Sequence, residues 1–92
     1  MPRYLVESYA DGRRERIDDM QERARLAAEL GASVEHVRTT FVPVDEVVLH
    51  IFDAQSEESL RDAFGQAGLD HERIVEAVER PADSVRKARD GA

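Results

Sequence analysis

The stretch Val34–Phe52, VEHVRTTFVPVDEVVLHIF, decides the fold, because here two β-type runs adjoin with no helix between them. The turn-forming residues Pro43 to Glu46 separate the runs, which predicts a hairpin with strands at about 33–42 and 46–53. If the turn centres on Val44 and Asp45, antiparallel pairing places Phe41 opposite Val48, Thr39 opposite His50, and Val37 opposite Phe52. Directly opposed residues share a face, so these side chains are predicted to lie together on one side of the sheet.

A strand and a helix are predicted before the hairpin. Residues 3–9 alternate in polarity as a strand does. Asp18 and Gln21 have the capping-box spacing, which predicts that a helix begins at Asp18. The apolar positions of this helix recur every three or four residues, at Met20, Ala24, Ala27 and Leu30. Gly31 is expected to end the helix in the left-handed conformation.

A second helix and a last strand are predicted after the hairpin. Ser56 is expected to cap the helix and Gly68 to end it, while Gly65 inside it indicates a close backbone contact. The inner face carries Leu60, Ala63, Phe64 and Ala67. Residues 72–79 suit either helix or strand by propensity. We expect a strand, because the sheet otherwise lacks its last member.

The resulting order, strand, helix, strand, strand, helix, strand, is that of a ferredoxin-like α+β sandwich. Right-handed crossovers place the third strand between the first and second, in a four-stranded antiparallel sheet with both helices on one face. We expect one domain at residues 1–80, followed by a charged tail at 81–92 that is frayed or forms a short helix. The other sheet face is left bare, which calls for a second copy of the chain or for a ligand, as in dimeric α+β barrels.

Composition restricts the function. The 92 residues include no cysteine, which excludes disulfides, thiolate metal sites and a cysteine nucleophile. A net charge of −7 argues against nucleic-acid binding. The chain shows no apolar run of membrane-spanning length and opens directly into a strand pattern, so we expect a cytoplasmic protein. The charged run Arg13 to Arg16 is expected to be a solvated loop or, alternatively, an anion site.

Three segments also carry a resemblance to a known family. The segments are residues 2–7 (PRYLVE), residues 52–54 (FDA) with 56–58 (SEE), and residues 68–69 (GL) with 72–74 (ERI). Together they resemble a family of small ferredoxin-like proteins, largely of unknown function, that includes a nickel-binding member. The similarity runs from Pro2 to about Val78. It implies a homodimer in which the bare sheet faces meet, with a surface or interface site for a divalent metal. Family members carry a histidine at the position of Thr39 and a cysteine at that of His50.

The bare face is predicted to carry the ligand site. The strand at 3–9 neighbours the third strand, so Glu7 and His50 are expected to lie close together, which would orient the imidazole and raise its pKa. Three interpretations are open: His50 is a core or interface histidine bonded to Thr39 or Glu7, it contacts a bound ligand, or it acts as a general base. The candidate ligand-binding residues are Glu7, Tyr9, Val37, Thr39, Phe41, Val48, His50 and Phe52.

The candidate metal ligands are His50, His36 and His71. Strand parity places His36 on the face opposite His50, where we expect it to be exposed. His71 lies between Asp70 and Glu72, and the three side chains offer a surface site for a divalent ion or, more simply, a solvated loop.

The sequence therefore predicts a small homodimeric binding protein that holds a divalent metal such as nickel, or a small ligand. The alternative is a cofactor-free enzyme of the oxygenase, isomerase or cyclase type, with His50 and Glu7 in a cavity at the dimer interface. A purely structural interaction partner is a further possibility.

Overall fold

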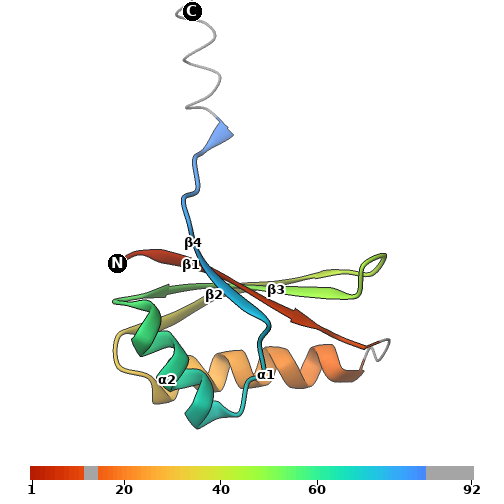
Figure 1. Ribbon diagram of the computed structural model, residues 1–92, viewed down its shortest axis with the longest axis horizontal. Helices are drawn as coiled ribbons and strands as arrows, with labels where there is room; N and C mark the ends of the chain where they lie inside the picture. The colour runs from red at the N-terminus through yellow and green to blue at the C-terminus, as the bar shows by residue number, and fades with distance from the viewer. Residues whose placement is uncertain (12–14, 83–92) are drawn as a thin grey trace, which may run out of the picture.

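The computed structural model describes residues 1–11 and 15–82. Its elements are β1 (Arg3–Tyr9), α1 (Glu15–Leu30), β2 (Val34–Val42), β3 (Val47–Ala54), α2 (Glu57–Ala67) and β4 (Arg73–Ala77). The strands form one antiparallel sheet in the order β2-β3-β1-β4, and both helices lie on the same side of it (Figure 1). The predicted ferredoxin-like α+β fold is confirmed. The predictions for Arg13, Arg14 and residues 83–92 lie outside the described residues.

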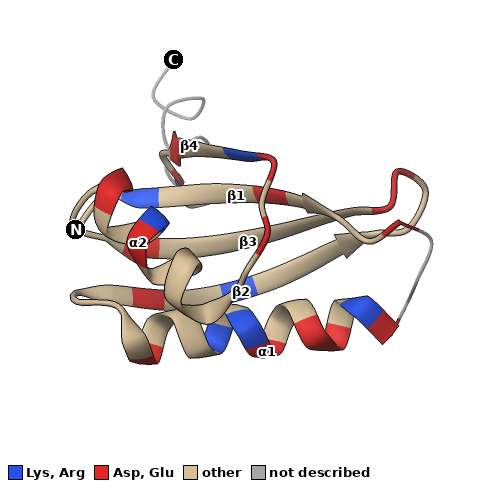
Figure 2. Cartoon of the chain, turned by 60° about the horizontal axis from the view of Figure 1, so that its bottom comes forward, with Lys and Arg blue, Asp and Glu red and all other residues tan. Residues whose placement is uncertain are grey.

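The core fills the space between the helices and one sheet face. Alternate residues of the two central strands are buried there, with Tyr4, Val6 and Ser8 from β1 and Val48, His50, Phe52 and Ala54 from β3. The helices contribute their small and apolar positions, Met20, Ala24 and Ala27 from α1 and Leu60, Ala63, Phe64 and Ala67 from α2. Charged residues of both signs occupy the outer side of α1 (Figure 2), where Arg23 pairs with Asp19. No helix of the described segments is long and apolar enough to cross a membrane.

The hairpin has the predicted register near its turn and a different one farther away. Phe41 pairs with Val48 and Thr39 with His50, as expected. Beyond them the register shifts between His36 and Arg38, so that His36, rather than Val37, lies opposite Phe52. Val37 is the extra residue of a β-bulge, and the predicted Val37–Phe52 pair is wrong. One inserted residue reverses the sheet face toward which the side chains of all preceding strand residues point. The side chain of His36 therefore points toward the helices.

The ends of α1 also differ from the prediction. The helix begins at Glu15 rather than Asp18. Gly31 has no positive φ; the left-handed residue of this connection is Ser33, with φ 56°. Gly31 is instead needed for space, because a Cβ there would lie 2.7 Å from the Cβ of Ala63 in α2. The predicted close contact at Gly65 is absent among the described residues, since its added Cβ would meet nothing within 4 Å.

The ends of α2 are as predicted. The Ser56 hydroxyl accepts a hydrogen bond from the Ser59 amide at 3.1 Å. Gly68 closes the helix in the left-handed region, with φ 70°. These caps fix where the chain leaves α2 and enters the Leu69–Glu72 connection to β4, which borders the pocket described below.

Candidate functional site

Glu7 and His50 lie on opposite faces of the sheet. Val6 is the partner of His50, and Leu49 is the partner of Glu7. The predicted Glu7–His50 pair is therefore wrong. Apolar side chains occur on both faces of β3, so the strand pattern does not indicate which face the helices cover. In the structure they cover the face that carries His50.

The eight candidate ligand-binding residues are accordingly divided between the two faces. Thr39, Phe41, Val48, His50 and Phe52 face the helices. Glu7 and Tyr9 lie on the bare face, where the Tyr9 hydroxyl donates to Glu7 at 3.3 Å. Val37 is the bulge residue and is exposed. The structure therefore does not bring the eight residues together in one ligand site.

His50 is instead part of a buried polar cluster with Thr39 and His36. Its side chain is fully buried, and its Nδ1 lies 2.8 Å from the Thr39 hydroxyl oxygen. The same oxygen lies 2.9 Å from Nε2 of His36, whose facing toward the core corrects the prediction of an exposed position on the other side. Nε2 of His50 is buried and has no hydrogen-bond partner among the described residues. We call these three residues the histidine–threonine cluster.

Burial disfavours the protonated form of both imidazoles of this cluster. It lowers the pKa of His50 to about 4, and the neighbouring His36 adds to the effect. Burial also lowers the pKa of His36, against an opposing backbone hydrogen bond at Arg38. Both rings are therefore neutral near pH 7. A buried neutral histidine with no carboxylate partner lacks the arrangement of a general base near pH 7, and the core interpretation with a bond to Thr39 fits these contacts.

The described residues do not fit a metal centre. Residues 1–11 and 15–82 contain no group of three or more His, Cys, Asp or Glu side chains placed to hold an ion. The histidine–threonine cluster supplies two imidazoles and no carboxylate, and His71 lies apart from it, against Phe64 of α2 at a ring-centroid distance of 5.3 Å. The donor set expected from the family resemblance is thus incomplete in this part of the chain.

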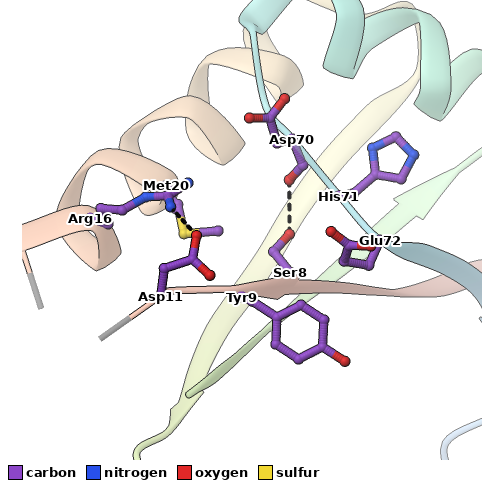
Figure 3. Close-up of a pocket in the computed structure, with 8 residues that line it drawn as sticks. All are labelled: Ser8, Tyr9, Asp11, Arg16, Met20, Asp70, His71 and Glu72. Carbon is purple, nitrogen blue, oxygen red and sulfur yellow. Dashed lines mark hydrogen bonds and ion pairs between the residues drawn. The ribbon is translucent and has the colours of Figure 1, made fainter. Parts of the chain in front are cut away.

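A separate polar pocket of about 340 Å³ lies where the end of β1, the start of α1 and the α2–β4 connection meet (Figure 3). It is lined by Ser8, Tyr9, Asp11, Arg16, Met20, Asp70, His71 and Glu72. We call it the β1-end pocket. Its walls are held together by two contacts between β1 and the connection. The Ser8 hydroxyl donates to the Asp70 carbonyl at 2.9 Å, and the Glu72 amide donates to the Glu7 carbonyl at 2.7 Å.

The lining of the β1-end pocket carries excess negative charge. Asp11 is paired with Arg16 at 2.6 Å. The carboxylates of Asp70 and Glu72 form no ion pair with any other residue of the described ranges. His71 adds a buried Nδ1 that has no partner within those ranges, while its Nε2 lies 3.3 Å from Nη1 of Arg61. The pocket thus presents mainly the carboxylate oxygens of Asp70 and Glu72 to whatever enters it.

Sequence reasoning found part of this pocket and missed the rest. The sequence predicts Asp70, His71 and Glu72 as a surface site for a divalent ion or as a solvated loop. It does not predict Ser8, Asp11 or Met20 there, and it gives Arg16 only as part of a solvated loop or an anion site. Antiparallel pairing of β1 with β4 nevertheless brings the end of one strand beside the start of the other. The predicted topology implies that the ends of these two strands are neighbours. The β1–α1 and α2–β4 connections therefore lie at the same end of the sheet.

The bare sheet face is apolar at its centre and charged along one border. Leu5, Leu49, Ile51 and Val75 form adjoining positions across β1, β3 and β4. At the border, Arg3 makes a two-pronged contact with Asp53 at 2.7 and 2.9 Å. Glu79 bridges Arg3 and Arg38, each at 2.7 Å. The helices lie on the other side of the sheet (Figure 1), and no described element covers this centre.

Comparison with known proteins supports the fold alone. The architecture is that of the ferredoxin-like α+β class. No protein-family model matches the chain, and no curated protein matches it. Among solved structures, the chain is similar to SCO4226 from Streptomyces coelicolor A3(2), known from a crystal structure, with a TM-score of 0.70 and 11% identity. The match covers 86% of this chain and 99% of that one.

Proposed function

We propose that the protein is a homodimeric binding protein whose ligand is a small organic cation, held in the β1-end pocket. The observation that carries this proposal is the placement of two uncompensated carboxylates, Asp70 and Glu72, in one pocket with His71. A volume of about 340 Å³ is near the lower end of the range for ligand pockets, which suits a molecule of a few heavy atoms.

Different lining residues are suited to bind different parts of a small amine. An ammonium group donates up to three hydrogen bonds, which the carboxylates of Asp70 and Glu72 accept with charge assistance. Met20 supplies an apolar and adaptable surface for a short carbon chain. The overall charge of −7 favours the approach of a cation and disfavours an anion.

The homodimer is proposed from the bare sheet face. A domain of this size gains stability from covering an apolar face, and a second copy offers a surface of matching chemistry with two-fold symmetry. The border ion pairs of Arg3 and Arg38 limit the contact to the apolar centre. Tyr9 both lines the pocket and lies on the bare face, so pairing through this face would bring the partner next to the pocket.

The test is a calorimetric titration with 1,4-diaminobutane and with ethylamine, using sodium acetate as the anionic control. Wild type is compared with Asp70→Asn, Glu72→Gln and the matched control Glu35→Gln, which removes an exposed carboxylate from β2. We expect amine binding in wild type and Glu35→Gln, at least about tenfold weaker in the two pocket variants, and no heat from acetate. Equal binding in all four proteins, or none in wild type, would overturn the proposal.

Nickel is titrated in parallel, because the family resemblance predicts it. One outcome would change the proposed ligand: nickel binding that is lost in His71→Ala and is unaffected by 1,4-diaminobutane. The ligand would then be a metal ion whose coordination is completed by residues outside the described ranges. The enzyme alternative is not retained, because Glu7 and His50, the pair it required in one cavity, lie on opposite faces of the sheet.

A further inference from the structure

We propose that the histidine–threonine cluster is an acid-sensitive latch that holds the edge strand β2 in its bulged register on β3. The bulge at Val37 brings His36 to the same face as Thr39 and His50, which an unbulged strand would not do. The two imidazole rings then lie 6.2 Å apart, with the Thr39 hydroxyl bonded to a nitrogen of each. The cluster therefore joins residues on both sides of the bulge to the central strand.

The proton positions in this cluster follow from the number of donors. A hydroxyl has one proton, and among the described residues the Thr39 hydroxyl contacts no acceptor other than the two ring nitrogens. One ring nitrogen therefore donates to Thr39, and the other accepts from it. If His50 accepted at Nδ1, its proton would sit on Nε2, buried with no acceptor among the described residues. A buried N–H without a partner is rarer than a buried lone pair, so we assign Nδ1–H of His50 as the donor to Thr39. The Thr39 hydroxyl then donates to Nε2 of His36.

Protonation breaks this chain at its accessible end. His36 is only half-buried, whereas His50 is fully enclosed, so solvent protons reach His36 first. A proton on Nε2 of His36 removes the lone pair that accepts from Thr39 and places a positive charge beside the second imidazole. Protonating His50 as well would put two like charges about 6 Å apart in the core.

The surroundings do not compensate for that charge. The buried side chains of α1 and α2 are apolar, as are those of β1 and β3 that flank His50, Val6 and Phe52. The other titratable side chains on this face are Tyr4 of β1, Glu76 of β4 and His71. The one group that acts electrostatically on His50 is His36, and it disfavours the charged form. Glu76, the carboxylate on this face, lies on β4, two strands away from β3, so the imidazolium has no carboxylate beside it among the described residues.

The strand held by the latch is the part of the sheet most easily released. β2 is an edge strand, paired with β3 on one side and with nothing described on the other. Its segment before the bulge, residues 34–36, is joined to β3 in a register that differs by one residue from that of residues 38–42. Without the bond from Thr39 to His36, side-chain hydrogen bonding no longer favours the bulged register over the regular one.

The experiment measures amide hydrogen exchange and imidazole nitrogen shifts by NMR between pH 7.5 and 4.5. Wild type is compared with Thr39→Val, which keeps the shape of the side chain and removes the hydroxyl, and with His71→Gln as the control histidine. We expect protection of the paired amides at residues 34–38, corrected for intrinsic exchange, to fall at least about tenfold on acidification, while amides of β1 remain protected. His71→Gln should behave as wild type.

Thr39→Val should already show the lower protection at pH 7.5 and little further change. Protection at residues 34–38 that does not depend on pH in wild type would overturn the latch, as would equal protection in wild type and Thr39→Val at pH 7.5. The nitrogen shifts provide a test that does not require the variant to fold. A neutral His50 protonated on Nε2, rather than on Nδ1, would overturn the assigned chain of hydrogen bonds.

Discussion

Gly31→Ala should destabilise the protein, although replacing glycine by alanine usually does the opposite at a position without positive φ, such as this one. The new methyl would lie 2.7 Å from the Cβ of Ala63, 3.0 Å from the carbonyl oxygen of Ala27 and 3.0 Å from Cγ2 of Val34. Carbon atoms in contact prefer about 3.5–4.0 Å. The Cβ of Ala63 cannot rotate away, so α1 must move from α2.

The magnitude follows from two opposing effects. Overpacking a well-packed site costs about 1–3 kcal/mol, while restricting the unfolded chain returns about 0.4–1 kcal/mol. We expect a net loss of about 1–2 kcal/mol, read as a lower urea midpoint by circular dichroism. In a domain of this length that corresponds to a fall in Tm of roughly 4–16 °C.

Gly65→Ala is the matched control for this prediction. Gly65 lies on the exposed side of α2, and an added Cβ would meet nothing within 4 Å. The same substitution there should stabilise by about 1 kcal/mol, because alanine is the better helix former. A Gly31→Ala protein as stable as wild type, or a Gly65→Ala protein destabilised to the same extent, would refute the account of close approach between α1 and α2.

Three other predictions concern the α2 cap, acid stability and the dimer. Ser56→Ala should cost about 1 kcal/mol in urea denaturation, because the Ser59 amide loses its acceptor. The pKa of His50 falls from 6.5 in the unfolded chain to about 4 when folded, so the unfolded state binds more protons between these values and stability drops as pH falls through that window. The loss approaches about 3 kcal/mol by pH 4, and the slope should be shallower in His50→Gln, measured by urea denaturation at pH 7 and 4.5. Leu49→Arg should convert the proposed dimer to monomer in sedimentation velocity, whereas Val44→Arg, at an exposed turn position, should not; a monomeric wild type would contradict the dimer.

Most elements were predictable from the sequence because their signals are local, whereas β4 was expected from the topology and not from its own propensity. The caps at Ser56 and Gly68 and the turn after Pro43 depend on a few adjacent residues, and all three occur as expected. Which face of the sheet the helices cover is not determined by such local signals. In β1, both sets of alternate residues mix apolar and polar side chains, so strand periodicity alone left the choice of face to the packing of the helices.

The bulge explains why the histidine–threonine cluster could not be predicted. A bulge leaves no mark in composition, and Val37 is as suited to a regular strand position as its neighbours. With regular alternation, His36 lies on the bare face and Thr39 faces His50 alone. The inserted residue places His36 on the same face as Thr39 and His50. A register shift of one residue thus determines whether the core contains one imidazole or two imidazoles joined through the Thr39 hydroxyl.

The bulged register of β2 is favoured because it satisfies more hydrogen-bonding groups in the core than the regular register does. A polar group buried without a partner costs about 1–3 kcal/mol, and His50 is fully enclosed on the face that the helices cover. Thr39 satisfies one of its nitrogens in either register, but only the bulged register gives the Thr39 hydroxyl a second nitrogen, that of His36, to which it donates. The cost of a locally disrupted β-ladder is thereby offset by a hydrogen-bond chain that needs neutral imidazoles. The same chain that stabilises the bulge near pH 7 therefore makes it the part of the sheet that acid should open first.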